Sequence, residues 1–191
     1  MGGFFGVASR NDCVTDVFFG TDYHSHLGTR RGGLAFLGPD GFGRSIHDIS
    51  NTPFRTKFED ELPALHGRTG IGVISDTDSQ PLIIRSHLGT YAIVTVGAVR
   101  NAEEIAGRMF NRGSMHLAEN SAGEINPTEL VAALINQGAS FVEGIAAAQR
   151  QVAGSCSMLV LTDEGIYAAR DVCGRTPIVI GSREGAYAAT L

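Results

Sequence analysis

The chain has 191 residues, enough for one domain with a complete hydrophobic core. Its net charge is −5 and it carries no basic stripe, so we expect no nucleic-acid partner. No apolar run reaches the roughly 18 residues that a membrane-spanning helix needs, so we expect no membrane partner. These features are typical of a soluble globular protein, and we expect it to be cytoplasmic.

The cysteines and histidines give no sign of a metal site. Cys13, Cys156 and Cys173 are odd in number and widely spaced, which indicates free thiols in a reducing compartment. His24 and His26 lie two residues apart and would point to different faces of a helix, so joint metal ligation is not expected. We expect no metal and no cofactor.

Strand-like runs alternate with turns along the chain, and the 25 glycines favour a sheet-rich fold. Strands are predicted first over residues 4–8 and 33–37. A loop is expected at 28–33, and an irregular surface segment at 38–69, with solvated carboxylates at 59–61. The later predicted strands cover residues 70–75, 82–85, 91–96, 157–162, 166–170, 178–180 and 187–191, with a hairpin turn at 163–165.

Helices are predicted where Asn, Asp or Ser can accept hydrogen bonds from the first free N–H groups of a helix. The expected starts are Asn11 or Asp12, Asn101 with Glu104, Asn126 with Pro127 and Glu129, and Ser140 with Glu143. The first helix would bury Val14, Val17 and Phe18, and the second would end near Gly113. With roughly nine strands, this pattern predicts a layered α+β protein with stacked, largely antiparallel sheets.

Five segments, in order, carry a family resemblance. They are GGFFGV at 2–7, LGTR at 27–30, GIG at 70–72 with Gln80-Pro81 downstream, the strand and helix start at 91–105, and residues 140–181 with RDxxGxxP at 170–177. Together they resemble the amino-terminal glutaminase domain of class II glutamine amidotransferases of the amidophosphoribosyltransferase type. The resemblance covers essentially the whole chain. Arg170 and Asp171 are expected to form an ion pair or a turn cap.

This resemblance implies a fold and a setting. The fold is that of an amino-terminal nucleophile (Ntn) hydrolase, a four-layer αββα sandwich of two mostly antiparallel sheets. The setting is a longer chain in which residues 1–191 precede a phosphoribosyltransferase-like domain. The resemblance also implies a homo-oligomer and a place in purine-type biosynthesis.

Members of this family hydrolyse glutamine with an amino-terminal cysteine, whose own α-amino group acts as the base. An asparagine and a backbone N–H stabilise the oxyanion, while an arginine and an aspartate hold the carboxylate and ammonium of the substrate. The aligned positions in this chain are Gly2 for the cysteine, Ser75 followed by Asp76 for the arginine, Val96 followed by Gly97 for the Asn-Gly pair, and Pro127 for the aspartate.

All four roles are therefore lost together. Glycine has no nucleophile, serine cannot pair with a carboxylate as a guanidinium does, and valine donates no hydrogen bond. We expect a domain that has lost glutaminase activity and acts as a structural or regulatory unit.

Two alternatives stay open at this point. One is an active amidotransferase domain that supplies ammonia from a nucleophile elsewhere, for which Cys13 is the candidate; Cys156 and Cys173 are expected to be structural. The other is a small-ligand-binding module. In either case Arg30, in a loop that borders the glutamine pocket in the family, is a candidate ligand contact.

Overall fold

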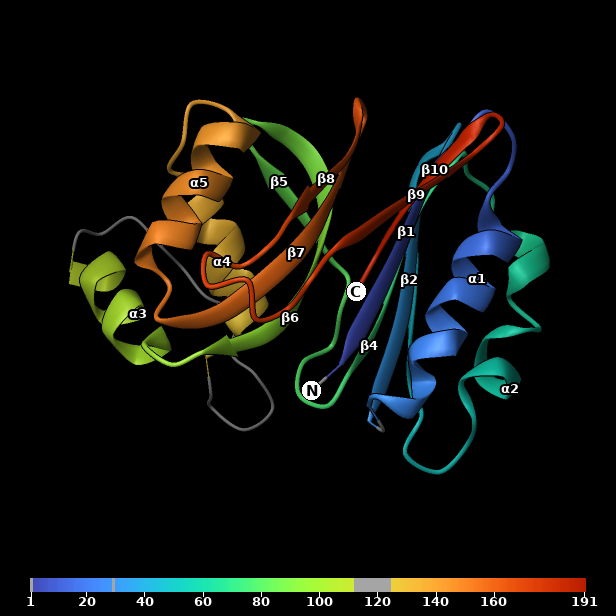
Figure 1. Ribbon diagram of the computed structural model, residues 1–191, viewed down its shortest axis with the longest axis horizontal. Helices are drawn as coiled ribbons and strands as arrows, with labels where there is room; N and C mark the ends of the chain where they lie inside the picture. Colours follow the sequence, from blue (N-terminus) through green and yellow to red (C-terminus); the bar gives the residue numbers. More distant parts are fainter. Residues whose placement is uncertain (1, 29, 112–124) are drawn as a thin grey trace.

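The computed structural model describes residues 2–28, 30–111 and 125–191 (Figure 1). Two antiparallel sheets face each other, and helices cover the outer face of each (Figure 1). Two helices, α1 and α2, lie on one side, and three, α3 to α5, lie on the other. This arrangement confirms the predicted αββα sandwich. The predicted helix end near Gly113 lies outside the described residues.

The larger sheet has six strands in the order β3-β2-β4-β1-β10-β9. Their bounds are β1 Gly3–Ser9, β2 Arg31–Gly38, β3 Gly41–Asp48, β4 Thr69–Ser75, β9 Val179–Arg183 and β10 Ala186–Thr190. The first strand lies inside the sheet, because Gly3 pairs with Ile74 of β4 and Phe5 pairs with Thr190 of β10. The amino terminus is therefore held at a fixed place between two strands.

The smaller sheet has four strands in the order β5-β6-β7-β8. Their bounds are β5 Leu82–Ser86, β6 Gly89–Val99, β7 Gly154–Thr162 and β8 Gly165–Ala169. The predicted hairpin is confirmed, since Thr162 pairs with Gly165 across the turn. After β8, the backbone N–H groups of Arg175 and Thr176 donate to the carboxylate of Asp171, which is buried, so this residue caps a turn as predicted.

The helices are α1 Val14–Tyr23, α2 Phe54–Phe58, α3 Ala102–Asn111, α4 Pro127–Ile135 and α5 Phe141–Gln151, with short 3₁₀ turns at His24–His26 and Leu62–Ala64. Two of the predicted starts are confirmed by their hydrogen bonds. The side chain of Asn126 accepts from the N–H groups of Thr128 and Glu129, and Pro127 is the first helical residue. The hydroxyl of Ser140 accepts from the N–H of Glu143.

The other two helix starts differ in detail. The cap position of α1 is Cys13, although Asp12 does accept a hydrogen bond from the N–H of Val14, at 3.1 Å. The helix start at Asn101 is confirmed, since α3 begins at Ala102, but the Asn101 side chain does not cap it. The Asn101 side chain accepts from the N–H of Ala153 and donates to the carbonyl of Gln151, because the chain after α5 passes beside it.

The prediction of an irregular segment at 38–69 is also wrong. Residues 38–41 form a tight turn, and β3 pairs with β2 along its length. Next, α2 places Phe54 and Phe58 in the core, with their rings stacked 4.4 Å apart. The predicted loop at 28–33 is correspondingly shorter, since β2 begins at Arg31.

Glu61 is not simply solvated, as residues 59–61 were expected to be. It accepts hydrogen bonds from the hydroxyl of Ser45 and, at 2.8 Å, from the ring of His47, both on β3. These contacts lower the pKa of the Glu61 carboxyl, the bond from Ser45 contributing most. Glu61, three residues after α2, therefore connects this part of the chain by hydrogen bonds to β3 at the edge of the larger sheet.

Apolar side chains fill all three spaces between the four layers. One cluster lies between α1, α2 and the larger sheet, and includes Val14, Val17 and Phe18 as predicted. A second lies between the sheets, and a third lies between the smaller sheet and α3 to α5. No helix among the described residues is long and apolar enough to cross a membrane.

Candidate functional site

A cavity of about 250 Å³ opens at the amino-terminal end of β1. Strands from both sheets and the start of α4 contribute to its wall. The structure brings together there six of the seven positions singled out from the sequence, namely Gly2, Ser75, Asp76, Val96, Gly97 and Pro127. The seventh, Arg30, does not line this cavity; its side chain is exposed.

Gly2 is packed closely against the neighbouring strand. A Cβ atom added to Gly2 would lie only 2.1 Å from the carbonyl oxygen of Ile74 at the end of β4. That distance is far below a van der Waals contact, and the opposing atom belongs to the backbone, which cannot rotate away as a flexible side chain can. The position therefore lacks a nucleophile and also has no room for one.

The position of the expected substrate arginine is occupied by a serine with a structural role. Ser75 is buried, and its Oγ accepts hydrogen bonds from the N–H groups of Thr77 and Asp78 at 3.2 and 3.3 Å. These bonds shape the turn that follows β4 and carries Asp76 and Asp78 along the cavity wall. Within the described part of the chain, no lysine, arginine or histidine lines the cavity.

The position of the expected oxyanion donor is apolar. Val96 lies in β6 and belongs to the apolar cluster between the two sheets. Gly97 follows with a φ of 139°, and a Cβ there would lie 2.2 Å from the carbonyl oxygen of Ser155. This backbone conformation and the close approach of β7 both require glycine.

Pro127 begins α4, so its ring occupies the place where the sequence comparison puts a substrate-binding carboxylate. The next residue, Thr128, is fully buried and its hydroxyl lies 2.6 Å from the hydroxyl of Thr95 on β6. The start of α4 is therefore hydrogen-bonded to the smaller sheet, and the hydroxyl groups of this pair are directed to each other.

Gln80 is a site residue that sequence reasoning missed. It is buried, and its amide donates to the carbonyl of Thr95 at 3.2 Å and accepts from the N–H of Thr95 at 2.7 Å. This pair of bonds fixes the β6 backbone next to Val96. Its sequence signal was a polar residue before a proline, which does not reveal a partner 15 residues away.

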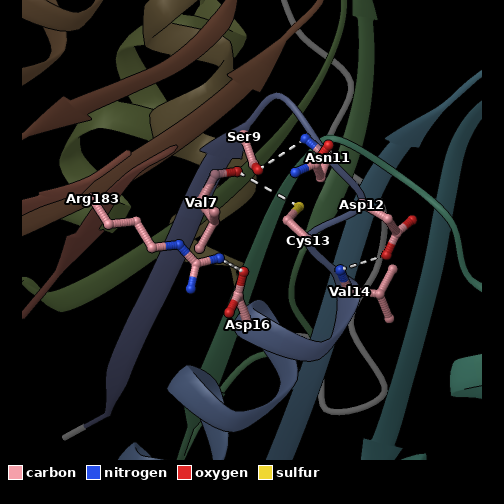
Figure 2. Close-up of polar contacts among 8 residues, drawn as sticks. All are labelled: Val7, Ser9, Asn11, Asp12, Cys13, Val14, Asp16 and Arg183. Atoms are coloured by element: carbon pink, nitrogen blue, oxygen red, sulfur yellow. Dashed lines mark hydrogen bonds and ion pairs between the residues drawn. The ribbon is translucent and has the colours of Figure 1, made fainter. Parts of the chain in front are cut away.

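Cys13 is a packed core residue. It is fully buried behind β1, and its thiol is directed at the carbonyl of Val7 at 3.9 Å (Figure 2). Burial, together with the nearby charges of Asp12 and Asp16, raises the pKa of Cys13 to about 12. A helix start tends to lower the pKa of a nearby thiol, but here burial and the two carboxylates outweigh that effect.

The other two cysteines differ in exposure. Cys156, on β7, is among the residues that line the cavity, yet only 2% of its surface is exposed. Burial and the charge of Asp171 raise its pKa to about 12. Along β7 it shares a face with Met158 and Val160, which pack against the helices and not into the space between the sheets. Cys173 is exposed, and all three thiols are free.

His24 is packed beside the start of β1. Its Nε2 lies 2.8 Å from the hydroxyl of Thr190, while its buried Nδ1 has no hydrogen-bond partner among the described residues. The ring touches the backbone of Gly3, where a Cβ would lie 2.6 Å from the imidazole. Among the described residues, no three His, Cys, Asp or Glu side chains gather where they could hold a metal ion.

The four-layer architecture, with an internal first strand whose amino-terminal end opens into a cavity, is that of the Ntn hydrolases. The family described as a glutamine amidotransferase domain matches residues 66–190. The chain belongs to this family, and it is similar to proteins named amidophosphoribosyltransferase.

Among similar proteins, the amidophosphoribosyltransferase of Methanocaldococcus jannaschii is 26% identical over 196 residues, covering 96% of this chain and 40% of that protein. The amidophosphoribosyltransferase of Synechocystis sp. is 26% identical over 193 residues, covering 95% of this chain and 38% of that protein. The chain thus spans about two fifths of the length of these two relatives.

Solved structures share the fold. The glutamine phosphoribosylpyrophosphate amidotransferase of B. subtilis superposes with a TM-score of 0.84 at 22% identity, over 98% of this chain and 41% of that one. A glutamine amidotransferase from Pseudomonas aeruginosa, assigned by prediction, superposes with a TM-score of 0.52 at 10% identity, over 98% of this chain and 82% of that one.

Proposed function

We propose that this glutamine amidotransferase domain has lost the ability to hydrolyse glutamine. The observation that carries the proposal is the wall of the cavity at the end of β1. It presents glycine, serine, valine and proline at the four aligned catalytic positions, and two aspartates at its rim. At the aligned nucleophile position glutamine would meet only glycine, and none of the described residues that line the cavity offers a guanidinium to its α-carboxylate.

The magnitudes favour complete loss over slow turnover. Removing a single oxyanion donor slows acyl transfer by about 10²–10³-fold, and removing the nucleophile ends the covalent route. Burial raises the pKa of Cys156 to about 12, so this thiol is neutral at pH 7. Neither Cys13 nor Cys156 therefore supplies a ready thiolate.

The domain then serves as a structural or regulatory unit of a longer protein. In support, two curated relatives named amidophosphoribosyltransferase are more than twice as long as the part that this chain matches. We propose that residues 1–191 form the amino-terminal domain of such a protein, joined to a phosphoribosyltransferase-like domain. The homo-oligomeric state and the cytoplasmic location stay predictions.

A sensitive assay of ammonia release from glutamine tests the loss of activity. We expect no release above uncatalysed hydrolysis. Cys156→Ser and Cys13→Ala, assayed in parallel, identify the origin of any signal. Turnover that disappears in one of these variants would show an active enzyme and overturn the proposal; the same background in all three proteins supports it.

The second candidate function is an active amidotransferase that uses Cys156. It is favoured by one observation, that Cys156 is the cysteine among the residues lining the cavity. This function requires a conformational change that exposes the Cys156 thiol to solvent and thereby lowers its pKa. Alkylation by iodoacetamide measures this directly: we expect Cys173, which is exposed, to react quickly and Cys156 to be protected in the folded protein.

A further inference from the structure

A second cavity, of about 650 Å³, lies at the opposite end of β1. Three loops form it: the connection from β1 to α1, the turn between β2 and β3, and the segment that leads into β4. The residues contributed are Arg10 to Asp12, Leu37 to Pro39, and His66 to Arg68. None of these lines the cavity at the amino terminus, so the two sites are separate.

Backbone hydrogen bonds hold two of these loops together. The N–H of Ser9 donates to the carbonyl of Arg68, and the N–H of Cys13 donates to the carbonyl of Gly67, both at 2.8 Å. The N–H of Gly67 donates to the carboxylate of Asp12 at 3.0 Å. The loop that carries Arg10 and the loop that carries Arg68 are thus fixed relative to each other.

Two arginines, Arg10 and Arg68, line this cavity. Within the described chain, the exposed guanidinium groups of Arg10 and Arg68 form no ion pair and no hydrogen bond, as is also true of Arg85 and Arg100; what sets Arg10 and Arg68 apart is that they line one cavity. Arg10 is nevertheless anchored, because its backbone N–H donates to the carbonyl of Gly185. Its side chain also runs past Gly185: a Cβ added to that glycine would lie 3.6 Å from the Cδ of Arg10.

The cavity carries a positive balance in a protein of net charge −5. Its carboxylate, Asp12, already accepts from the N–H groups of Val14 and Gly67, and its contact with the ring of His66 is long, at 4.0 Å. One carboxylate therefore faces two guanidinium groups. A guanidinium offers a planar set of donors that fits the oxygens of a phosphate or a carboxylate.

We propose that this cavity binds a small molecule through an oxyanion group, either a phosphate or a carboxylate. Arg10 and Arg68 donate to the oxyanion from two sides, and the remaining volume accommodates the rest of the molecule. The assignment rests on the positive balance of the cavity, on two arginines that line it, and on the hydrogen bonds that fix their loops relative to each other. It does not depend on whether the amino-terminal cavity is catalytic.

Titration with inorganic phosphate and, separately, with acetate tests the site, at an ionic strength held constant with sodium chloride. The readouts are the melting temperature and the backbone amide resonances of Asn11 and Gly67. The double variant Arg10→Gln/Arg68→Gln removes the site. The matched control, Arg85→Gln/Arg100→Gln, removes two exposed arginines that lie outside the cavity.

We expect phosphate to shift both readouts in the wild type and in the control. In the double variant we expect the dissociation constant to rise by about tenfold or more, as the loss of a hydrogen bond to a charged group implies. A response to phosphate alone indicates a phosphate-bearing ligand, and an equal response to acetate indicates a carboxylate ligand. The proposal is overturned if neither anion shifts the two amide resonances. It is also overturned if the Arg10→Gln/Arg68→Gln variant binds phosphate as tightly as the wild type and the control do.

Discussion

The two ends of β1 differ in charge but not in rigidity. At the Gly2 end, the described residues of the cavity wall include aspartates and no basic side chain; at the Arg10 end, roughly 25 Å away, two guanidinium groups have no partner among the described residues. Backbone or side-chain hydrogen bonds fix the walls at both ends, through Gln80 at one and Gly67 at the other. The hydrogen bonds that shape each cavity wall are therefore independent of which charged side chains line that cavity.

The result that would contradict this comparison most strongly is glutamine hydrolysis by a variant with a cysteine at position 2. We expect Gly2→Cys to give no ammonia release from glutamine, because the thiol would arrive without an oxyanion donor or a carboxylate partner. We also expect it to lower the free energy of unfolding by about 1–3 kcal/mol, since its Cβ must displace the Ile74 carbonyl. Gly107→Cys, where a Cβ meets nothing within 4 Å, is the control for stability. Measurable turnover by Gly2→Cys would contradict the argument that the oxyanion donor and the carboxylate partner are missing.

The next effect concerns the scaffold of the Gly2 end. Gln80→Ala removes both hydrogen bonds to Thr95 and leaves a buried N–H and C=O without partners, so we expect the free energy of unfolding to fall by about 2–3 kcal/mol. Urea denaturation measures it. Gln151→Ala, which loses one bond of 3.5 Å, should change stability by about 0.5 kcal/mol or less. Equal losses in the two variants would show that Gln80 does not hold the site.

A smaller effect is expected at the edge strand β3. Glu61→Gln should cost about 0.5–1 kcal/mol at pH 7, because the half-exposed carboxylate loses charge-assisted bonds that solvent partly screens. The lowered pKa of Glu61 sets the sign: its contribution is complete above the ordinary glutamate pKa and disappears as the pH falls through the lowered value. Urea denaturation at pH 7 and at acid pH should therefore show a shrinking difference between wild type and variant. A constant difference would argue against this assignment.

The smallest expected effect is the response of His24 to pH. Burial, and secondarily the charge of His26, lowers the pKa of His24, so the unfolded chain takes up a proton before the folded protein does. Stability from this group is complete above the ordinary histidine pKa and is lost as the pH falls below it. We expect His24→Asn to show a flatter fall in melting temperature between about pH 7.5 and 5.5 than His26→Asn, which alters an exposed ring. Identical slopes would exclude His24 as the source.

Local chemistry made much of the fold predictable. Asn126 with Pro127, and Ser140 with Glu143, are start signals that need only neighbouring residues, and both were found. Asn101 carries the same kind of signal and α3 does begin after it, but its side chain bonds to the backbone of Ala153 instead of capping the helix, a tertiary contact that no local pattern contains. The strand β3 was missed because it lies at a sheet edge, where half-exposed residues give only weak alternation.

The candidate site was predictable in position and less so in detail. Alignment to a family pattern located six residues that line one cavity, because the order and pairing of the strands bring these positions together. Arg30 was misplaced, since a loop residue can turn outward without altering the flanking strands. The roles of Gln80 and Ser75 could not be read from the sequence, because each depends on which N–H groups the fold brings near.

The conformation of Gly97 has a consequence for interpreting such motifs in other chains. With a carbonyl oxygen of β7 where its side chain would begin, this position admits only hydrogen, whatever reaction the neighbouring residues perform or have ceased to perform. A glycine preserved in a degenerate motif is thus a marker of strand crossing and carries no information about turnover. Only its neighbours, which are free to vary, report whether the chemistry has survived.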